Sequence, residues 1–174
     1  STFKTYASSG VLPLVGQWNT HTYGGNNADR ARISHLAYQA KKPLWMSEVG
    51  AGGNGIGGNL SLAKKLIDDM RYIQPEAWID WQYMEENNDQ WCTIKGSFSK
   101  QTYTKVKNYY VRQQCTRFIK EGYDIVTSLS DNSLAAVNPS RDTLVVVLIN
   151  EGTAAVHNID LSFFEPVKYK YKAR

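Results

Sequence analysis

Cysteine and histidine are scarce in this 174-residue chain, which argues against the commonest disulfide and metal frameworks. Two cysteines, Cys92 and Cys115, are too few for a disulfide scaffold and have no metal-ligand spacing. One bridge between them and two free buried thiols both fit the sequence. The three histidines, His21, His35 and His157, lie in separate segments, so we expect neither a metal nor a cofactor.

Long apolar runs and dense basic stretches are also missing. No apolar run reaches the roughly 18 residues that a membrane span needs. The net charge is +4, but the positive residues are scattered. The one dense cluster, VKYKYK at 167–172, alternates lysine with apolar residues as a solvated edge strand does. We therefore expect no membrane span and no nucleic-acid partner. The chain opens at Ser1 without a methionine or a visible signal peptide and stops in a strand-like pattern, so we interpret it as part of a longer protein.

Aromatic side chains are abundant instead, with 5 Trp and 11 Tyr. Such rings offer large flat faces with a polar handle, which suits them to stacking on ligands as well as to filling a core. The sequence therefore fits both a Tyr-rich core and an aromatic binding surface.

Three strand-then-helix units occupy the first part of the chain. Strand patterns cover 11–23, 43–49 and 77–83, and helical stripes cover 28–40, about 59–74 and about 99–120. Asn26 or Asn27 can cap the first helix, and Gly122 is placed as the left-handed residue after the last. The repeat of roughly 30 residues fits an eight-fold β/α barrel and a doubly wound sheet alike.

From Tyr123 the pattern changes to short strands at 123–129, 133–137, 143–150, 154–161 and 167–172, separated by polar turns. We predict β/α units over 1–120 and an all-β module over 121–174. The predicted fold class is thus α/β plus all-β.

The loop GAGGNG at 50–55 matches the G-x-G-x-x-G pattern of dinucleotide-binding folds, and Asp80 imitates the acid that binds ribose there. Two points count against this interpretation. The further glycines in IGGN make a helix start before Asn59 improbable, so no helix N-terminus would meet the phosphates. Glu48 would also repel them. The competing interpretation is that the glycines keep a cleft open beside Glu48.

That competing interpretation depends on strand alternation. Glu48 is predicted to share a face with Leu44 and Met46, while the neighbouring strands contribute two further rows, namely Asn19, His21 and Tyr23, and Ile79, Trp81 and Tyr83. Polar residues at the C-terminal ends of barrel strands meet at the active-site mouth. A carboxylate flanked by Tyr, His and Trp suits sugar chemistry, because glycoside hydrolysis uses an ionised carboxylate at the anomeric carbon. Taken singly, Glu48 also fits an ion pair, His21 a structural histidine, and Trp81 a core residue.

The chain resembles glycoside hydrolase family 30, a retaining family of barrel enzymes. The resemblance lies in five segments that occur in the family's order, namely NTHTYGG (19–25), KKPLWMSEVG (41–50), AWIDWQYMEE (77–86), NYYVRQQCTRFIKEGY (108–123) and LVVVLIN (144–150). It implies the last three βα units of a (β/α)₈ TIM barrel, followed by an incomplete β-sandwich-like side domain. It also implies Glu48 as the nucleophile and Asn19, His21, Tyr23 and Trp81 as substrate-binding residues.

Within the family, the segments look most like endo-β-1,6-galactanases, and related members act on glucuronoxylan, β-1,6-glucan or glucosylceramide. The resemblance implies a secreted enzyme with a polysaccharide or oligosaccharide substrate. The family's acid/base Glu, which follows an Asn on the fourth strand, has no counterpart here, since Glu85, Glu86 and Glu151 are misplaced for that role. We therefore expect this chain alone to be inactive and its partner to be the N-terminal half of the same protein. A non-catalytic carbohydrate-binding module and the dinucleotide fold are the alternatives.

Overall fold

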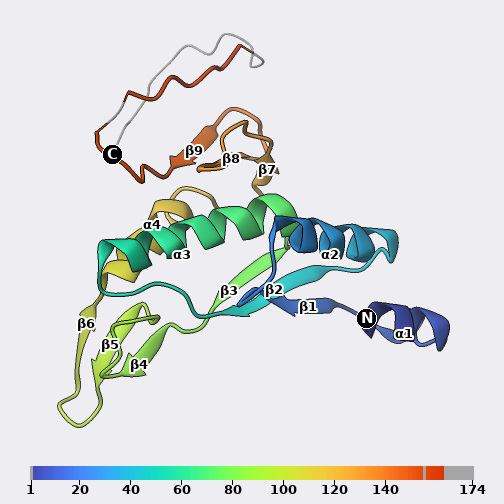
Figure 1. Cartoon of the computed structure of the whole chain (residues 1–174), viewed down its shortest axis with the longest axis horizontal. Helices are drawn as coiled ribbons and strands as arrows, with labels where there is room; N and C mark the ends of the chain where they lie inside the picture. Colours follow the sequence, from blue (N-terminus) through green and yellow to red (C-terminus); the bar gives the residue numbers. More distant parts are fainter. Residues whose placement is uncertain (1, 155, 163–174) are drawn as a thin grey trace.

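The structure is a computed structural model that describes residues 2–154 and 156–162. After a short helix, α1 (Thr2–Ser8), and a 3₁₀ turn (Leu12–Leu14), a parallel sheet forms in the order β1–β2–β3 (Trp18–His21, Leu44–Val49, Ala77–Asp80). Helices α2 (Asn27–Gln39) and α3 (Ile56–Asp68) connect these strands and cover one face of the sheet (Figure 1). The predicted alternation of parallel strands and helices is therefore observed.

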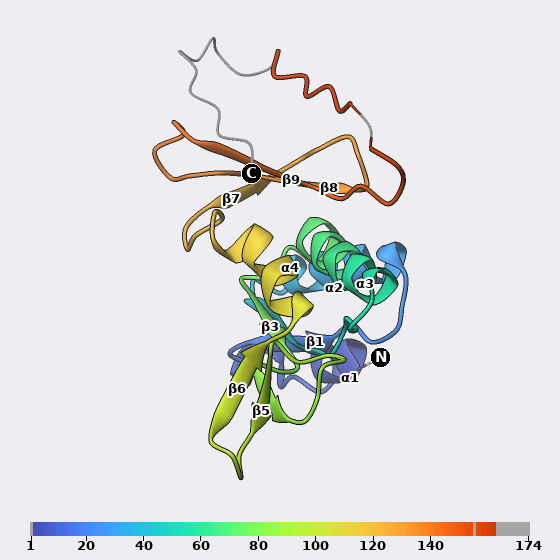
Figure 2. The ribbon, with the colours of Figure 1, turned by 90° about the vertical axis from the view of Figure 1, so that its left-hand side faces the viewer.

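Two smaller sheets follow. Strands β4 (Met84–Glu86), β5 (Ile94–Ser97) and β6 (Thr102–Lys105) form the first, and the β5–β6 hairpin extends away from the body of the molecule (Figure 1). Helix α4 (Lys107–Thr116) leads to the second, an antiparallel sheet of β7 (Asp124–Val126), β8 (Ser133–Val137) and β9 (Leu144–Leu148). Figure 2 shows this last sheet on the opposite side of the helices from β1–β3.

Two apolar clusters hold these layers together. The first joins β2 to α2 and to the segment after α3, through Leu44, Met46, Val49, Ala37 and Ile73. The second joins α3 to the β7–β9 sheet, through Leu66, Ile67, Leu134 and Ile149. Trp78 of β3 also packs against the second cluster, which therefore connects the β7–β9 module to both α3 and the β1–β3 sheet.

The helix starts and ends follow local chemistry. Asn26 is the N-cap of α2, and it forms a capping box in which its side chain accepts from the backbone N–H of Asp29 while the Asp29 carboxylate accepts from the backbone N–H of Asn26. Helix α3 runs on into a π-helical turn, Asp69–Ile73, and Gln74 then adopts a left-handed conformation before Pro75. The N-cap and the helix end at Pro75 agree with the sequence prediction.

The predicted long helix over 99–120 is wrong in its first part. Thr102–Lys105 is strand β6, which pairs antiparallel with Ile94–Ser97, and α4 begins only at Lys107. The segment TYTK alternates β-branched and longer residues, a pattern that favours a strand over a helix. Gly122 does have a positive φ of 80°, but α4 ends at Thr116, so this glycine serves a later turn.

Three other boundaries also differ. Helix α3 starts at Ile56, three residues before the predicted Asn59, because Gly55 serves as its N-cap and the helix accommodates Gly57 and Gly58. Strand β3 ends at Asp80 rather than at residue 83. Residues 156–161 form no strand, and the predicted strand at 167–172 lies outside the described residues. The domain boundary near residue 120 stays a prediction.

Candidate active site

Glu48 lies near the C-terminal end of β2, at a bulge that the sequence pattern did not reveal. Between Thr20 and His21 on β1, the pairing on β2 advances from Met46 to Glu48. Against β3, it advances from Met46 to Val49 while β3 moves by only two residues, from Trp78 to Asp80. Strand β2 therefore contains one extra residue relative to both neighbours, and such a bulge reverses which face the following side chains occupy.

The prediction that Glu48 shares a face with Leu44 and Met46 is consequently wrong. Those two side chains are buried against the helices, and Val49 joins them with no exposed surface. Without the bulge, strict alternation would have directed Glu48 into that apolar layer. The extra residue instead aligns Glu48 with His21 on the face that the helices leave uncovered, where its side chain is 29% exposed.

His21, the last residue of β1, and Tyr23, in the segment after it, flank the Glu48 carboxylate. The Tyr23 hydroxyl donates a hydrogen bond to Oε1 at 2.7 Å, and Nε2 of His21 lies 3.9 Å from Oε2. The His21 and Tyr23 rings meet edge to face with centroids 6.2 Å apart. Partial desolvation and the hydrogen bond to Glu48 raise the pKa of Tyr23 above its ordinary value, so the phenol keeps its proton and stays a donor.

Asn19 lies on the same exposed face of β1 as His21, two residues closer to the start of the strand. It aligns with Trp45 of β2, and its side-chain oxygen accepts from Nε2 of Gln17 at 2.7 Å. The structure therefore places Asn19 on the predicted face, two residues before His21, without a direct contact to the Glu48 carboxylate.

Trp81 follows β3 and lies against the backbone just beyond Glu48. Its backbone N–H donates to the carbonyl of Val49, and the residue is 46% exposed. A Cβ added at Gly50 would lie 2.9 Å from the Trp81 carbonyl oxygen and 3.5 Å from Cδ1 of its ring. Gly50 is therefore needed for the close approach of Trp81, and the same position also meets Trp91, which the sequence interpretation had not included.

The glycine loop encloses a side chain of the protein itself. Asn108 of α4 is fully buried, and its Oδ1 accepts from the backbone N–H of Gly53 and from Nδ2 of Asn59. A Cβ at Gly52, whose φ is 123°, would lie 2.5 Å from that oxygen. The other end of the amide donates to the carbonyls of Gln90 and Cys92. Asn108 therefore joins the loop after β2 to the loop that carries Trp91.

The position of Asn108 corrects both interpretations of the glycine loop, as a phosphate-binding site and as a spacer that keeps a cleft open beside Glu48. Because α3 begins at Ile56, the absence of a nearby helix N-terminus no longer argues against a phosphate site. The space inside the loop is nevertheless filled by Asn108, and Gly52 makes room for that amide rather than for a cleft beside Glu48. Asp80 is also unlike a ribose-binding acid, since it is paired with Arg112 at 2.5 Å and accepts from Thr93.

Asp80 and Arg112 form a largely buried ion pair beside the site. Burial raises the pKa of Asp80 above its ordinary value, while the charge and hydrogen bond of Arg112 oppose that rise. Arg112 also donates to the carbonyls of Trp91 and Ala51, so it fastens α4 to both loops at the rim. The sequence analysis missed Arg112 because its acidic partner, Asp80, lies 32 residues earlier in the chain and no local pattern connects the two.

Both cysteines are free thiols. Cys92 is buried, with its Sγ donating to the carbonyl of Asn88, and Cys115 packs in the apolar cluster of α3 and β8. Among the residues described, none of the helices combines the length and apolar character required to cross a bilayer.

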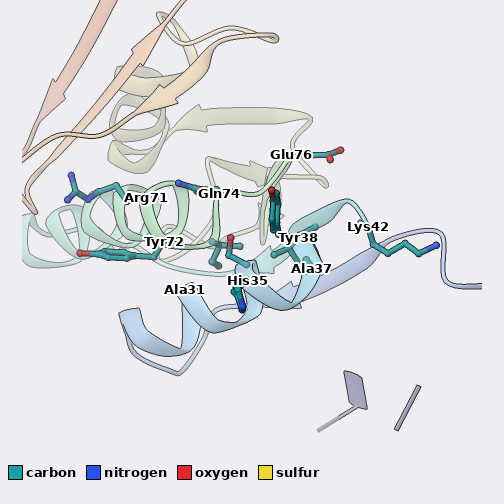
Figure 3. Close-up of a pocket in the computed structure, with 12 residues that line it drawn as sticks. Ala31, His35, Ala37, Tyr38, Lys42, Arg71, Tyr72, Gln74 and Glu76 are labelled. Atoms are coloured by element: carbon teal, nitrogen blue, oxygen red, sulfur yellow. The ribbon is translucent and has the colours of Figure 1, made fainter. Parts of the chain in front are cut away.

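A separate hollow of about 490 Å³ lies between α2 and the π-helical turn (Figure 3). Its lining includes His35 and Tyr38 on α2 and Arg71 and Tyr72 on the segment after α3, which Figure 3 labels. Its strand residue is Leu44, at the start of β2, about 13 Å along the strand from Glu48. This hollow is therefore distinct from the Glu48 site.

Comparisons with known proteins bear on these observations. No family model matches the chain. The chain is 31% identical over 163 residues to an endo-β-1,6-galactanase from Hypocrea rufa, a stretch that covers 93% of this chain and 33% of that protein. Its fold matches a family 30 endoxylanase from Clostridium papyrosolvens with a TM-score of 0.63 and 27% identity, over 84% of this chain and 36% of that one. For a family 30 subfamily 8 xylanase from Clostridium acetobutylicum, the TM-score is 0.65 and the identity 26%, over 87% and 38% of the two chains.

The chain thus spans about a third of the length of these relatives. The sequence comparison and the structure comparisons both find glycoside hydrolases, which confirms the resemblance seen in the motifs. The chain is similar, over most of its length, to one segment of the glycoside hydrolases of family 30, with an endo-β-1,6-galactanase among its relatives.

Proposed function

We propose that this chain is the nucleophile-bearing segment of a retaining glycoside hydrolase. In this proposal, β1–β3 are the last three strands of a (β/α)₈ barrel, residues 121–174 form part of its side β-domain, and Glu48 is the nucleophile. The observation that carries the proposal is the bulge in β2, which turns Glu48 away from the helices and beside His21 and Tyr23. The uncovered face of the sheet would then be the barrel interior.

Each neighbour has a role in this mechanism. Glu48 attacks the anomeric carbon, so a bond from its carboxylate oxygen forms while the glycosidic bond breaks. The acid/base residue protonates the departing oxygen, and water then hydrolyses the glycosyl-enzyme. The Tyr23 hydroxyl fixes one carboxylate oxygen by its hydrogen bond, which leaves the other oxygen, on the His21 side, free to attack. The exposed indole of Trp81 supplies an apolar wall for a pyranose ring, and Asn19 contributes a polar group deeper in the cleft.

A retaining mechanism also requires a second carboxyl group about 5 Å from the nucleophile. Glu85 and Glu86, on β4, are held elsewhere: Oε2 of Glu85 accepts from Asn88 and Oε2 of Glu86 accepts from the N–H of Phe98. We infer that the acid/base residue comes from outside residues 1–174 and that this chain alone does not cleave glycosidic bonds.

The proposed substrate is β-1,6-linked galactan, and the sequence relative named for that activity supports it. Because such polymers are extracellular, the parent protein would be secreted. A non-catalytic carbohydrate-binding role would use the same aromatic side chains but gives no function to a carboxylate that is held by Tyr23 and aligned with His21.

The test uses the parent protein that contains this chain. Glu48→Ala should abolish release of oligosaccharides from β-1,6-galactan while leaving binding intact, and added azide should restore cleavage of an activated aryl glycoside with formation of the glycosyl azide. Glu86→Ala is the matched control and should retain activity. Unchanged hydrolysis by Glu48→Ala would reject Glu48 as the nucleophile. Release of oligosaccharides by residues 1–174 alone would reject the inference that the acid/base lies elsewhere.

A further inference from the structure

Thr22 lies between the two residues that flank Glu48, and it faces the opposite way. While His21 and Tyr23 are exposed on the uncovered face, Thr22 is 4% exposed and lies toward the helices. Because it immediately follows β1, no β-ladder pairing fixes its backbone. Its own hydrogen bonds therefore decide where the side chains on either side of it lie.

The side chain of Thr22 is bound by Asp69, whose residue surface is completely buried. The Thr22 hydroxyl donates to Oδ2 of Asp69 at 2.8 Å, and Nε1 of Trp78 donates to the same oxygen at 2.9 Å. Nε of Arg30 donates to Oδ1 at 2.7 Å. One carboxylate thus connects the segment after β1 with α2 and with β3.

The backbone of Thr22 is held as well. Nζ of Lys65, on α3, donates to its carbonyl oxygen at 2.5 Å. Burial and the nearby charge of Arg30 lower the pKa of Lys65, which indicates that this ammonium is partly removed from water. Thr22 is therefore bound at both its side chain and its main chain by residues that come from outside β1.

The position of Asp69 in the chain is unusual. It is the first residue of the π-helical turn Asp69–Ile73, directly after α3. A π-helical turn shifts the helix register, and such turns are frequent at functional sites. A buried carboxylate with its Arg partner is also expensive to desolvate and is often no more stabilising than apolar packing would be. Stability alone therefore gives a weak reason for the arrangement.

We propose that Asp69 is a positioning residue, which holds Thr22 so that His21 and Tyr23 flank the Glu48 carboxylate. This inference rests on the proposed function. Asp69 touches neither Glu48 nor the substrate cleft, and it acts through the Thr22 hydroxyl. Releasing that hydroxyl lets the segment after β1 move, and a displacement of about 1 Å at a reacting group lowers rates by about a hundredfold.

The experiment compares two near-isosteric variants with a matched control in the parent enzyme. Asp69→Asn removes the charge, and Thr22→Val removes only the hydroxyl donor. Asp68→Asn alters the neighbouring carboxylate, which is largely buried and pairs with Lys64 at 2.6 Å. We expect Asp69→Asn and Thr22→Val to lower kcat on β-1,6-galactan by about 10- to 100-fold with little change in KM. Thr22→Ser should restore most of the rate, and Asp68→Asn should stay near the unmodified enzyme.

A second measurement distinguishes a positioning role of Asp69 from a purely structural one. If Asp69 acts through Tyr23, then Thr22→Val should have a much smaller effect on kcat in a Tyr23→Phe background than in the unmodified enzyme. Independent, multiplicative effects would overturn the proposal, as would a lowered unfolding temperature with an unchanged kcat. Where Asp69→Asn does not fold, Thr22→Val and Thr22→Ser decide the question. Survival of activity in Glu48→Ala would instead reject the proposed function and not this coupling.

Discussion

The hydroxyl of Tyr23 and Oε1 of Glu48 are joined by a 2.7 Å hydrogen bond between the segment after β1 and the bulge of β2. Because desolvation and the hydrogen bond to Glu48 raise the pKa of Tyr23, its hydroxyl stays protonated. The bond therefore joins a neutral donor to a carboxylate acceptor. Among the described residues, no Lys or Arg nitrogen lies within 4.0 Å of Glu48, so Tyr23 restrains the carboxylate without neutralising it.

We therefore predict that Tyr23→Phe lowers kcat/KM of the parent enzyme by about 10- to 100-fold, because a hydrogen bond to a charged group is worth about 1.5–3 kcal/mol. Initial rates on β-1,6-galactan measure this. Tyr38→Phe is the control, since Tyr38 is 82% exposed on α2 and lines the separate hollow. Equal rates for the two variants would show that the bond does not support the reaction.

The β/α part of the fold could be predicted because its signals are local. The Asn26 cap of α2, the apolar stripe of α3 and the apolar run of β2 each determine their own element. Alternation also placed Asn19, His21 and Tyr23 on one exposed face, as the structure shows. These elements need no information from distant parts of the chain.

The bulge in β2 could not be predicted, since it depends on pairing with two other strands. Strict alternation grouped Glu48 with Met46, whereas the bulge places it on the opposite face, and its role as the nucleophile stays a prediction. Asn108 was missed for a related cause. A single Asn on a polar helix has no sequence signal, and its importance comes from the loop that closes around it. Strand β6 was likewise not predicted, because it forms by pairing with β5 and the sequence does not show that pairing.

Two glycines in the segment that follows β2 should respond oppositely to alanine. Gly52 has a φ of 123°, and its Cβ would lie 2.5 Å from the Asn108 side chain, whereas a Cβ at Gly57 meets nothing within 4 Å. Gly52→Ala should lower the free energy of unfolding by about 2 kcal/mol or more. Gly57→Ala, inside α3, should raise it by about 0.5–1 kcal/mol. Urea unfolding of the chain measures both, and a neutral Gly52→Ala would contradict the enclosed Asn108.

Cys115 should make stability fall at alkaline pH. Burial raises the pKa of its thiol from 9.0 to about 12 in the folded chain. Because the folded pKa is the higher one, the neutral thiol stabilises the fold fully below pH 9, and this contribution is lost as the pH rises from 9 to 12. The unfolding free energy of the chain, measured relative to Cys115→Ala, should fall by about 1.4 kcal/mol between pH 7 and pH 10. A constant difference would show that the thiol is accessible to water.

Trp81 should act in substrate binding rather than in the attack by Glu48. Its ring is exposed beside Gly50 and makes no hydrogen bond to the carboxylate, so removing it should weaken ground-state binding and the transition state alike. We expect Trp81→Ala to raise KM of the parent enzyme about tenfold, which corresponds to about 1.4 kcal/mol of lost binding, with little change in kcat. Phe98→Ala is the control, because that ring is exposed at the β5–β6 turn. A fall in kcat at constant KM would instead place the indole in contact with the reacting centre, where its edge would shape the sugar ring during the attack.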